Sequence, residues 1–103
     1  MKTLYYVKVG FREPTKIVVI KEVLGILRIT KVLNFSHVLS SEIVEICKGF
    51  QQRAKNKQSI AFTADSDTFR SYLSENGIEN VIRVNEEIEQ RVLEFIKKEE
   101  KEC

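Results

Sequence analysis

The fold depends on the stretch Lys16-Ile17-Val18-Val19-Ile20-Lys21-Glu22-Val23-Leu24-Gly25-Ile26-Leu27-Arg28-Ile29, which fits two different structures. Several of its aliphatic residues recur at helical spacing behind Pro14, a residue suited to the first turn of a helix. The uninterrupted β-branched run from Ile17 to Ile20 instead favours a buried strand. We expect one strand at 16–21 and a second at about 26–34.

The segments on both sides of this stretch have clearer patterns. Leu4–Gly10 is rich in β-branched and aromatic residues and ends at a glycine, which predicts a first strand. From Ser41 onward apolar residues recur at helical spacing, which predicts an amphipathic helix capped by Ser40 or Ser41. The apolar face of this helix comprises Ile43, Ile46, Cys47, Phe50 and Ala54.

The second half of the chain alternates strands and helices. Ser59–Ala64 predicts a buried strand, and Asp65 is suited to cap a helix that Gly77 ends in a left-handed conformation. Val81–Val84 predicts another short strand, and Asn85 is suited to cap a last helix. Such alternation is typical of parallel strands with right-handed crossovers. The last helix places Ile88, Val92, Phe95 and Ile96 on one face.

Composition supports one folded domain over residues 1–103. The chain is 43% hydrophobic and 31% charged, which is ordinary for a folded protein and far from the composition of disordered chains. We therefore expect a single α/β domain with a small open mixed or parallel sheet of about four to five strands. The formal net charge of +2 is too small to predict nucleic-acid binding.

The cysteines and histidine do not predict a metal or a cofactor. Cys47 and Cys103 have no closely spaced Cys or His companion, and His37 is the only histidine. The apolar segment Thr3–Val9 is too short for a membrane span or a signal sequence. A reduced cytoplasm is the simplest compartment, in which Cys47 is a buried small hydrophobe and Cys103 a tail thiol.

The strand-to-helix turns are the expected place for function. In open α/β sheets, ligands meet the carboxyl ends of the strands, where the turns 37–41, 64–68 and 84–87 gather. Ser40 and Ser41 begin a helix, where backbone N–H groups favour an anion such as a phosphate, although capping alone would also explain both serines.

The same turns give little sign of catalysis. His37 lies three residues before Ser40, yet no nucleophile elbow surrounds the serine. Asp65 and Asp67 at a helix start are more typical of capping than of a metal site. We therefore expect a protein that is not an enzyme.

From Val32 to Ile96, the order and spacing of the elements resemble the STAS family, the domain shared by sulfate transporters and anti-sigma factor antagonists. Val32-Leu33-Asn34-Phe35-Ser36-His37-Val38-Leu39-Ser40-Ser41 resembles the strand and loop that lead into the family's D-S-S-G type turn. Phe69 to Val84 is similar to its closing half. The resemblance covers about two-thirds of the chain.

The resemblance implies a non-enzymatic regulatory module that docks a partner protein of the switch-kinase or anti-sigma-factor type. It also implies phosphorylation of the first serine of the turn, which is Ser40 here, with Ser41 beside it. The expected partner-binding residues are His37, Ser40, Ser41, Glu42, Glu45 and Asp65.

A second fold remains open from the sequence. A small flavodoxin-like or receiver-like domain would bind an anionic small ligand at the same strand ends, and it requires a helix over 14–25 to complete a regular βα repeat. In either fold, an exposed strand at the N-terminal edge is a candidate for dimerisation.

Overall fold

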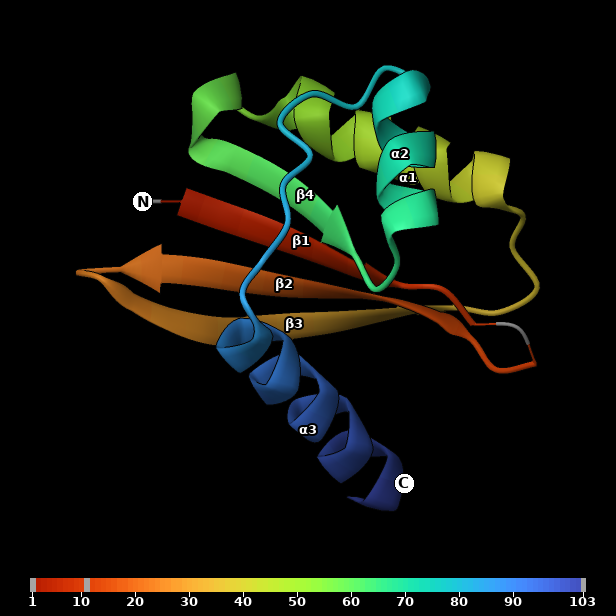
Figure 1. Ribbon diagram of the computed structural model, residues 1–103, viewed down its shortest axis with the longest axis vertical. Coiled ribbons are helices and arrows are strands. Elements are labelled where there is room, and N and C mark those ends of the chain that lie inside the picture. Colours follow the sequence, from red (N-terminus) through yellow and green to blue (C-terminus); the bar gives the residue numbers. More distant parts are fainter. Residues whose placement is uncertain (1, 11, 103) are drawn as a thin grey trace.

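The computed structural model describes residues 2–10 and 12–102. Its centre is a four-stranded mixed sheet in the order β3-β2-β1-β4 (Figure 1). β1 pairs antiparallel with β2 and parallel with β4, and β2 pairs antiparallel with β3. The predicted α/β class with a small mixed sheet is confirmed. The strands are β1 Lys2–Lys8, β2 Thr15–Val23, β3 Ile26–Phe35 and β4 Ile60–Ala64.

The ambiguous stretch forms a β-hairpin. β2 and β3 pair along their whole length, and Val18, Val19 and Ile20 in the β-branched run are all buried. A strand buried on both faces explains why this run is continuously apolar rather than alternating. The helix over 14–25 is therefore wrong, and the flavodoxin-like alternative loses the element that it requires.

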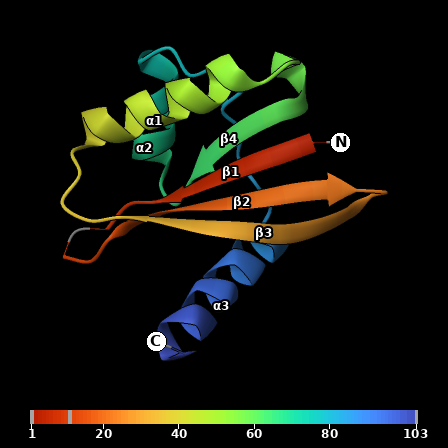
Figure 2. The same ribbon diagram turned by 180° about the vertical axis from the view of Figure 1, so that it is seen from behind.

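Helices cover both faces of the sheet. α1 Ser40–Arg53 and α2 Asp67–Glu75 lie over one face, and α3 Glu86–Glu102 crosses the other, as Figures 1 and 2 show from opposite sides. A short 3-10 turn, η1 Lys57–Ser59, leads from α1 into β4. Within the part of the chain that the structure describes, no helix is both long and apolar enough to cross a membrane.

Alternation along β1 divides the core in two. Tyr5 and Val7 face α1 and α2, and Tyr5 stacks on Phe50 of α1 with ring centroids 4.5 Å apart. Leu4 and Tyr6 point to the opposite face, toward α3. Because successive side chains of a strand point to opposite faces, each helical layer packs against its own set of apolar strand residues. The α3 layer buries Tyr6, Val18, Ile20, Val92 and Ile96.

The predicted strand at Val81–Val84 is wrong. Only Val81 pairs with the sheet, as an isolated parallel bridge to Phe62, and the Ile82 N–H donates to the Phe62 carbonyl at 2.8 Å. Asn80 just before it has a positive φ of 56°. The chain forms this one bridge with β4 and then leaves to reach α3 on the other face (Figure 1).

Other local predictions are confirmed. Gly77 follows α2 with a φ of 92°, the left-handed conformation expected of a glycine there. The Asn85 carboxamide oxygen accepts from the Ile88 N–H at 2.9 Å and so caps α3. Cys47 is a free, fully buried cysteine, whereas Cys103 lies outside the described residues.

Candidate functional site

Three strands end at the same edge of the sheet. β1 is parallel to β4, and β2 runs antiparallel between β1 and β3, so the carboxyl ends of β3, β1 and β4 point the same way. The first turns of α1 and α2 follow the ends of β3 and β4 at this carboxyl edge. They enclose a shallow depression of about 370 Å³, called the edge depression below, lined by Val9, Ser40, Ser66, Thr68, Phe69 and Tyr72.

Ser40 and Ser41 do not cap α1, so that prediction is wrong. The N-cap position is Leu39, whose backbone is extended, and α1 has no side-chain cap on its N–H groups. The Leu39 N–H donates instead to Oε1 of Glu42 at 3.1 Å, so the glutamate ties down the start of the helix. Both serines are exposed in the first turn, with hydroxyls that are not used in capping.

Ser66, rather than Asp65, caps α2. Its Oγ accepts from the Phe69 N–H at 3.2 Å. Asp65 is held by β1 instead: its N–H donates to the Val7 carbonyl at 3.0 Å, and its Oδ1 accepts from the Val9 N–H at 3.5 Å. The predicted cap is displaced by one residue because Asp65 still belongs to the parallel pairing with β1. Sequence reasoning missed Ser66, although serine at a helix start is a strong signal.

Two carboxylates near this edge have shifted pKa values of opposite sign. Burial raises the pKa of Asp65, and the negative charge of Glu89 adds to that rise. A hydrogen bond from Arg70 lowers the pKa of the exposed Asp67, and Arg83 lies 3.4 Å from its other oxygen. Asp67 thus contacts two arginines. The side chains that line the edge depression carry hydroxyls but no charge.

The other predicted residues are spread over separate surfaces. His37 is exposed with a φ of 56° and lines a smaller depression beside Pro14 and Thr15. Glu45 lies on the exposed side of α1, 3.6 Å from the amine of Lys48. Ser40 therefore lines the same depression as residues at the start of α2, whereas His37 and Glu45 do not line it.

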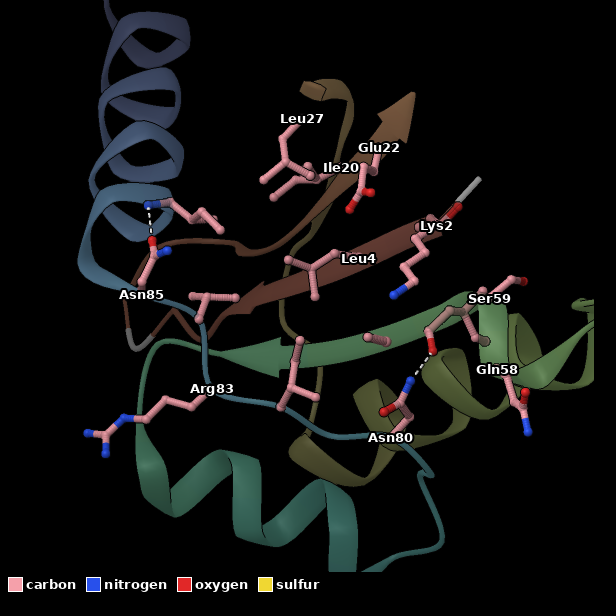
Figure 3. Close-up of a pocket in the computed structure, with 16 residues that line it drawn as sticks. Lys2, Leu4, Ile20, Glu22, Leu27, Gln58, Ser59, Asn80, Arg83 and Asn85 are labelled. Carbon is pink, nitrogen blue, oxygen red and sulfur yellow. Dashed lines mark hydrogen bonds between the residues drawn. The ribbon is translucent and has the colours of Figure 1, made fainter. Parts of the chain in front are cut away.

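A larger cavity than the edge depression lies at the opposite, amino end of β1 and β4 (Figure 3). This open groove measures about 500 Å³, and Leu4, Ile20 and Leu27 form part of its apolar lining. Sequence reasoning missed it because its lining comes from the two ends of the chain and from both strands of the hairpin. Among its polar residues are Lys2, Glu22, Gln58, Asn80, Arg83 and Asn85.

Several polar groups of this groove already serve the fold. The Asn80 amide donates to the Ile60 carbonyl at 2.6 Å, and Asn85 caps α3. Figure 3 shows the Arg83 side chain turned away from the groove, consistent with its ion pair with Asp67 on α2. Lys2 and Glu22, which are register partners, are the charged groups left at its rim.

Metal ligands are not gathered in the described part of the chain. No group of three or more His, Cys, Asp or Glu side chains lies within metal-binding range among these residues. The two carboxylates near the carboxyl edge, Asp65 and Asp67, are engaged by a backbone N–H and by arginines respectively.

Comparison with known proteins identifies the fold alone. No family model and no curated protein sequence matches the chain. Two crystal forms of the large terminase from a thermophilic bacteriophage are similar in structure, with TM-scores of 0.64 and 0.65 at 18% and 17% identity. The matches cover 82% and 86% of this chain but only 23% and 24% of the terminase. The fold is therefore shared with part of a larger protein, and the STAS resemblance stays a prediction.

Proposed function

We propose that this domain is a non-enzymatic protein-interaction module that docks a partner protein in the edge depression, under the control of phosphorylation at Ser40. The observation that carries the proposal is that Ser40 lines the same depression as Ser66 and Thr68. Two helix starts, α1 and α2, thus present hydroxyls to a single surface, beside the rings of Phe69 and Tyr72.

The chemistry of this surface suits an acidic peptide segment. The first-turn N–H groups of a helix have no intrahelical acceptor, and the helix dipole favours negative charge at that end. The half-buried ring of Tyr72, whose centroid lies 5.6 Å from that of the buried Phe69, offers apolar area for a neighbouring side chain. An acidic residue next to an apolar one in the partner would satisfy both features.

Ser40 is placed where a phosphate would act on such a partner. It is exposed in the first turn of α1, where a phosphate is favoured by the helix dipole. A phosphate adds about −1.5 to −2 charges, and on Ser40 it would stand at the lining of the depression. We expect phosphorylation to release an acidic partner by charge repulsion. Control by phosphorylation is what the resemblance to anti-sigma factor antagonists implies.

The geometry gives no support to a serine hydrolase. His37 and Ser40 line different depressions, so the imidazole is not positioned as a base for that hydroxyl. Asp65 is engaged by the Val9 N–H rather than directed at His37. Binding is therefore the better account of the serine turn.

The test starts from partner capture with the immobilised domain from its native cell extract. Thr68→Arg should block the edge depression and abolish capture, whereas Gln52→Arg, an equally exposed change on α1, should leave it intact. Ser40→Asp should weaken capture more than Ser41→Asp, because Ser40 lines the depression. Capture that survives both Thr68→Arg and Ser40→Asp would contradict the proposal.

Phosphorylation is tested separately. The domain is incubated with the captured partner fraction and ATP, and the modified residue is located by mass spectrometry. Phosphate on Ser40 is the expected result. Absence of phosphate from both Ser40 and Ser41 would remove the regulatory part of the proposal and leave docking to the capture experiment.

A further inference from the structure

The tip of the β2–β3 hairpin exposes a compact group of aliphatic side chains. Leu24 is 97% exposed, Ile26 56% and Val23 47%. The tip projects beyond the other elements in both ribbon views (Figures 1 and 2). Apolar side chains exposed to this extent add little to the stability of the isolated fold, so this group is suited to a contact outside the domain.

The turn itself is built from an unfavourable residue. Val23 pairs with Ile26, and the two residues between them both have positive φ, 54° at Leu24 and 77° at Gly25. Two-residue loops of this kind prefer Asn-Gly or Asp-Gly, because most side chains are strained at positive φ. Leucine in that position adds both strain and exposed apolar area.

Basic side chains stand behind the tip on one face of the hairpin. Lys21 and Arg28 are direct cross-strand partners, and Lys31 pairs with Val19. Strand alternation places Lys21 and Arg28 on the same face as Val23 and Ile26, and the register shift between Val19 and Ile20 brings Lys31 onto that face as well. Like charges directly opposite one another are destabilising, and none of the three basic residues forms an ion pair among the described residues.

The hairpin carries almost no negative charge to balance these three basic side chains. Glu22 is the only acidic residue between positions 15 and 35. It points to the opposite face of the sheet, where it lines the groove and has Lys2 as its register partner. The face that bears the basic residues is therefore cationic up to the tip.

We propose that the β2–β3 hairpin binds the surface of an anionic lipid bilayer, with Val23, Leu24 and Ile26 inserted among the lipids. Lys21 and Arg28 lie about 7 Å behind Val23 and Ile26 along the strands, a depth that matches the distance from the acyl boundary to the headgroups. The inserted side chains are aliphatic, which suits hydrocarbon better than the stacking surfaces of nucleic-acid bases.

This site is independent of the edge depression. Glu22, next to the tip, pairs with Lys2 at the amino end of β1, whereas the edge depression lies beyond the carboxyl end of the same strand. The domain could therefore hold a partner at one end of the sheet while the other end contacts the bilayer. Loss of either activity would leave the other measurable.

Co-sedimentation with vesicles tests the proposal. The purified chain should bind vesicles of equal parts phosphatidylcholine and phosphatidylserine much more tightly than vesicles of phosphatidylcholine alone. Lys21→Gln and Arg28→Gln should each weaken binding about fivefold, the effect of one basic residue near an anionic surface. Gln90→Ala on the exposed side of α3 is the control, with no change expected.

Leu24→Asn separates binding from folding. Asparagine is favoured at this turn, so the variant should unfold at a higher temperature than the original chain while its vesicle binding falls about tenfold. No binding to the anionic vesicles, or binding unchanged by Leu24→Asn, would overturn the proposal. Tighter binding to a DNA duplex through the same residues, or self-association that depends on Leu24, would assign the tip to another partner and equally overturn it.

Discussion

The hydroxyl of Tyr6 donates a hydrogen bond to Oε1 of Glu89 at 3.2 Å. This contact joins β1 to the first turns of α3, across 83 positions of sequence. Tyr6 is fully buried, and burial, together with the negative charge of Glu89, raises the pKa of its phenol. The phenol therefore stays protonated and acts as the donor, which fixes the start of α3 against the sheet.

Replacing Tyr6 by phenylalanine should loosen α3. The substitution keeps the ring in the core but removes the hydroxyl, which should lower the free energy of unfolding by about 1 kcal/mol. Urea denaturation measures this change, and hydrogen exchange should show faster exchange confined to α3. Glu89→Gln, which retains an oxygen acceptor, serves as the matched control and should cost less. Equal stability and exchange in Tyr6→Phe and the original chain would contradict the role of this bond.

Asp65 predicts a specific pH dependence of stability. Because burial raises its pKa, the folded chain holds the Asp65 proton more tightly than the unfolded chain. The ionised form of Asp65 therefore stabilises the fold less than the protonated form. Its contribution becomes less favourable as the pH rises from about 4, the pKa of an aspartate in the unfolded chain, through the higher pKa of the folded chain.

Asp65→Asn removes this dependence while keeping an oxygen to accept from the Val9 N–H. We expect the variant to be more stable than the original chain at pH 7 and to lose that advantage below about pH 4. Urea unfolding at the two pH values measures the difference. A variant that is less stable at pH 7 would show that the charge of Asp65 stabilises the fold.

Thr63 is a buried residue whose hydroxyl has no hydrogen-bond partner among the described residues. It is the register partner of Tyr6 on the α3 face of the sheet. Valine has nearly the same shape and no polar atom to bury, so Thr63→Val should raise the free energy of unfolding by about 1 kcal/mol. Thermal unfolding followed by circular dichroism measures the effect. A destabilised Thr63→Val would indicate that the hydroxyl is hydrogen-bonded in solution.

Cys47 should be unreactive in the folded chain. It is fully buried, and burial raises the pKa of its thiol to about 12, so little thiolate forms near neutral pH. In a Cys103→Ser background, a thiol reagent should modify Cys47 only after urea is added. Rapid modification without denaturant would mean that α1 opens readily from the sheet.

The sequence predicted the elements whose patterns are strong and local. The helical spacing from Ile43 to Phe50 located α1, and the β-branched run at Ile17 to Ile20 located β2, because both patterns report burial directly. Asn85 and Gly77 were assigned correctly since each acts within its own helix end.

Features that depend on distant neighbours could not be predicted in this way. Val81–Val84 has the composition of a strand, yet only Val81 pairs with the sheet because the chain must cross to α3. Leu39 gave no capping signal, since the cap depends on Glu42 reaching back to its N–H. Ser40, Ser66 and Thr68 line one depression because the first turns of α1 and α2 lie together at the carboxyl edge. This arrangement could not be predicted without knowing the order of the strands.

Site-specific photocrosslinking tests the central claim, partner docking in the edge depression, most directly. A photoreactive phenylalanine analogue is placed at Ser41, next to Ser40 in the first turn of α1, or at Gln52 near the other end of α1, both of which are exposed. We predict a crosslink to one partner protein from Ser41 only, and its loss in the Ser40→Asp background. Equal crosslinking from both positions, or from Gln52 alone, would contradict docking at this site.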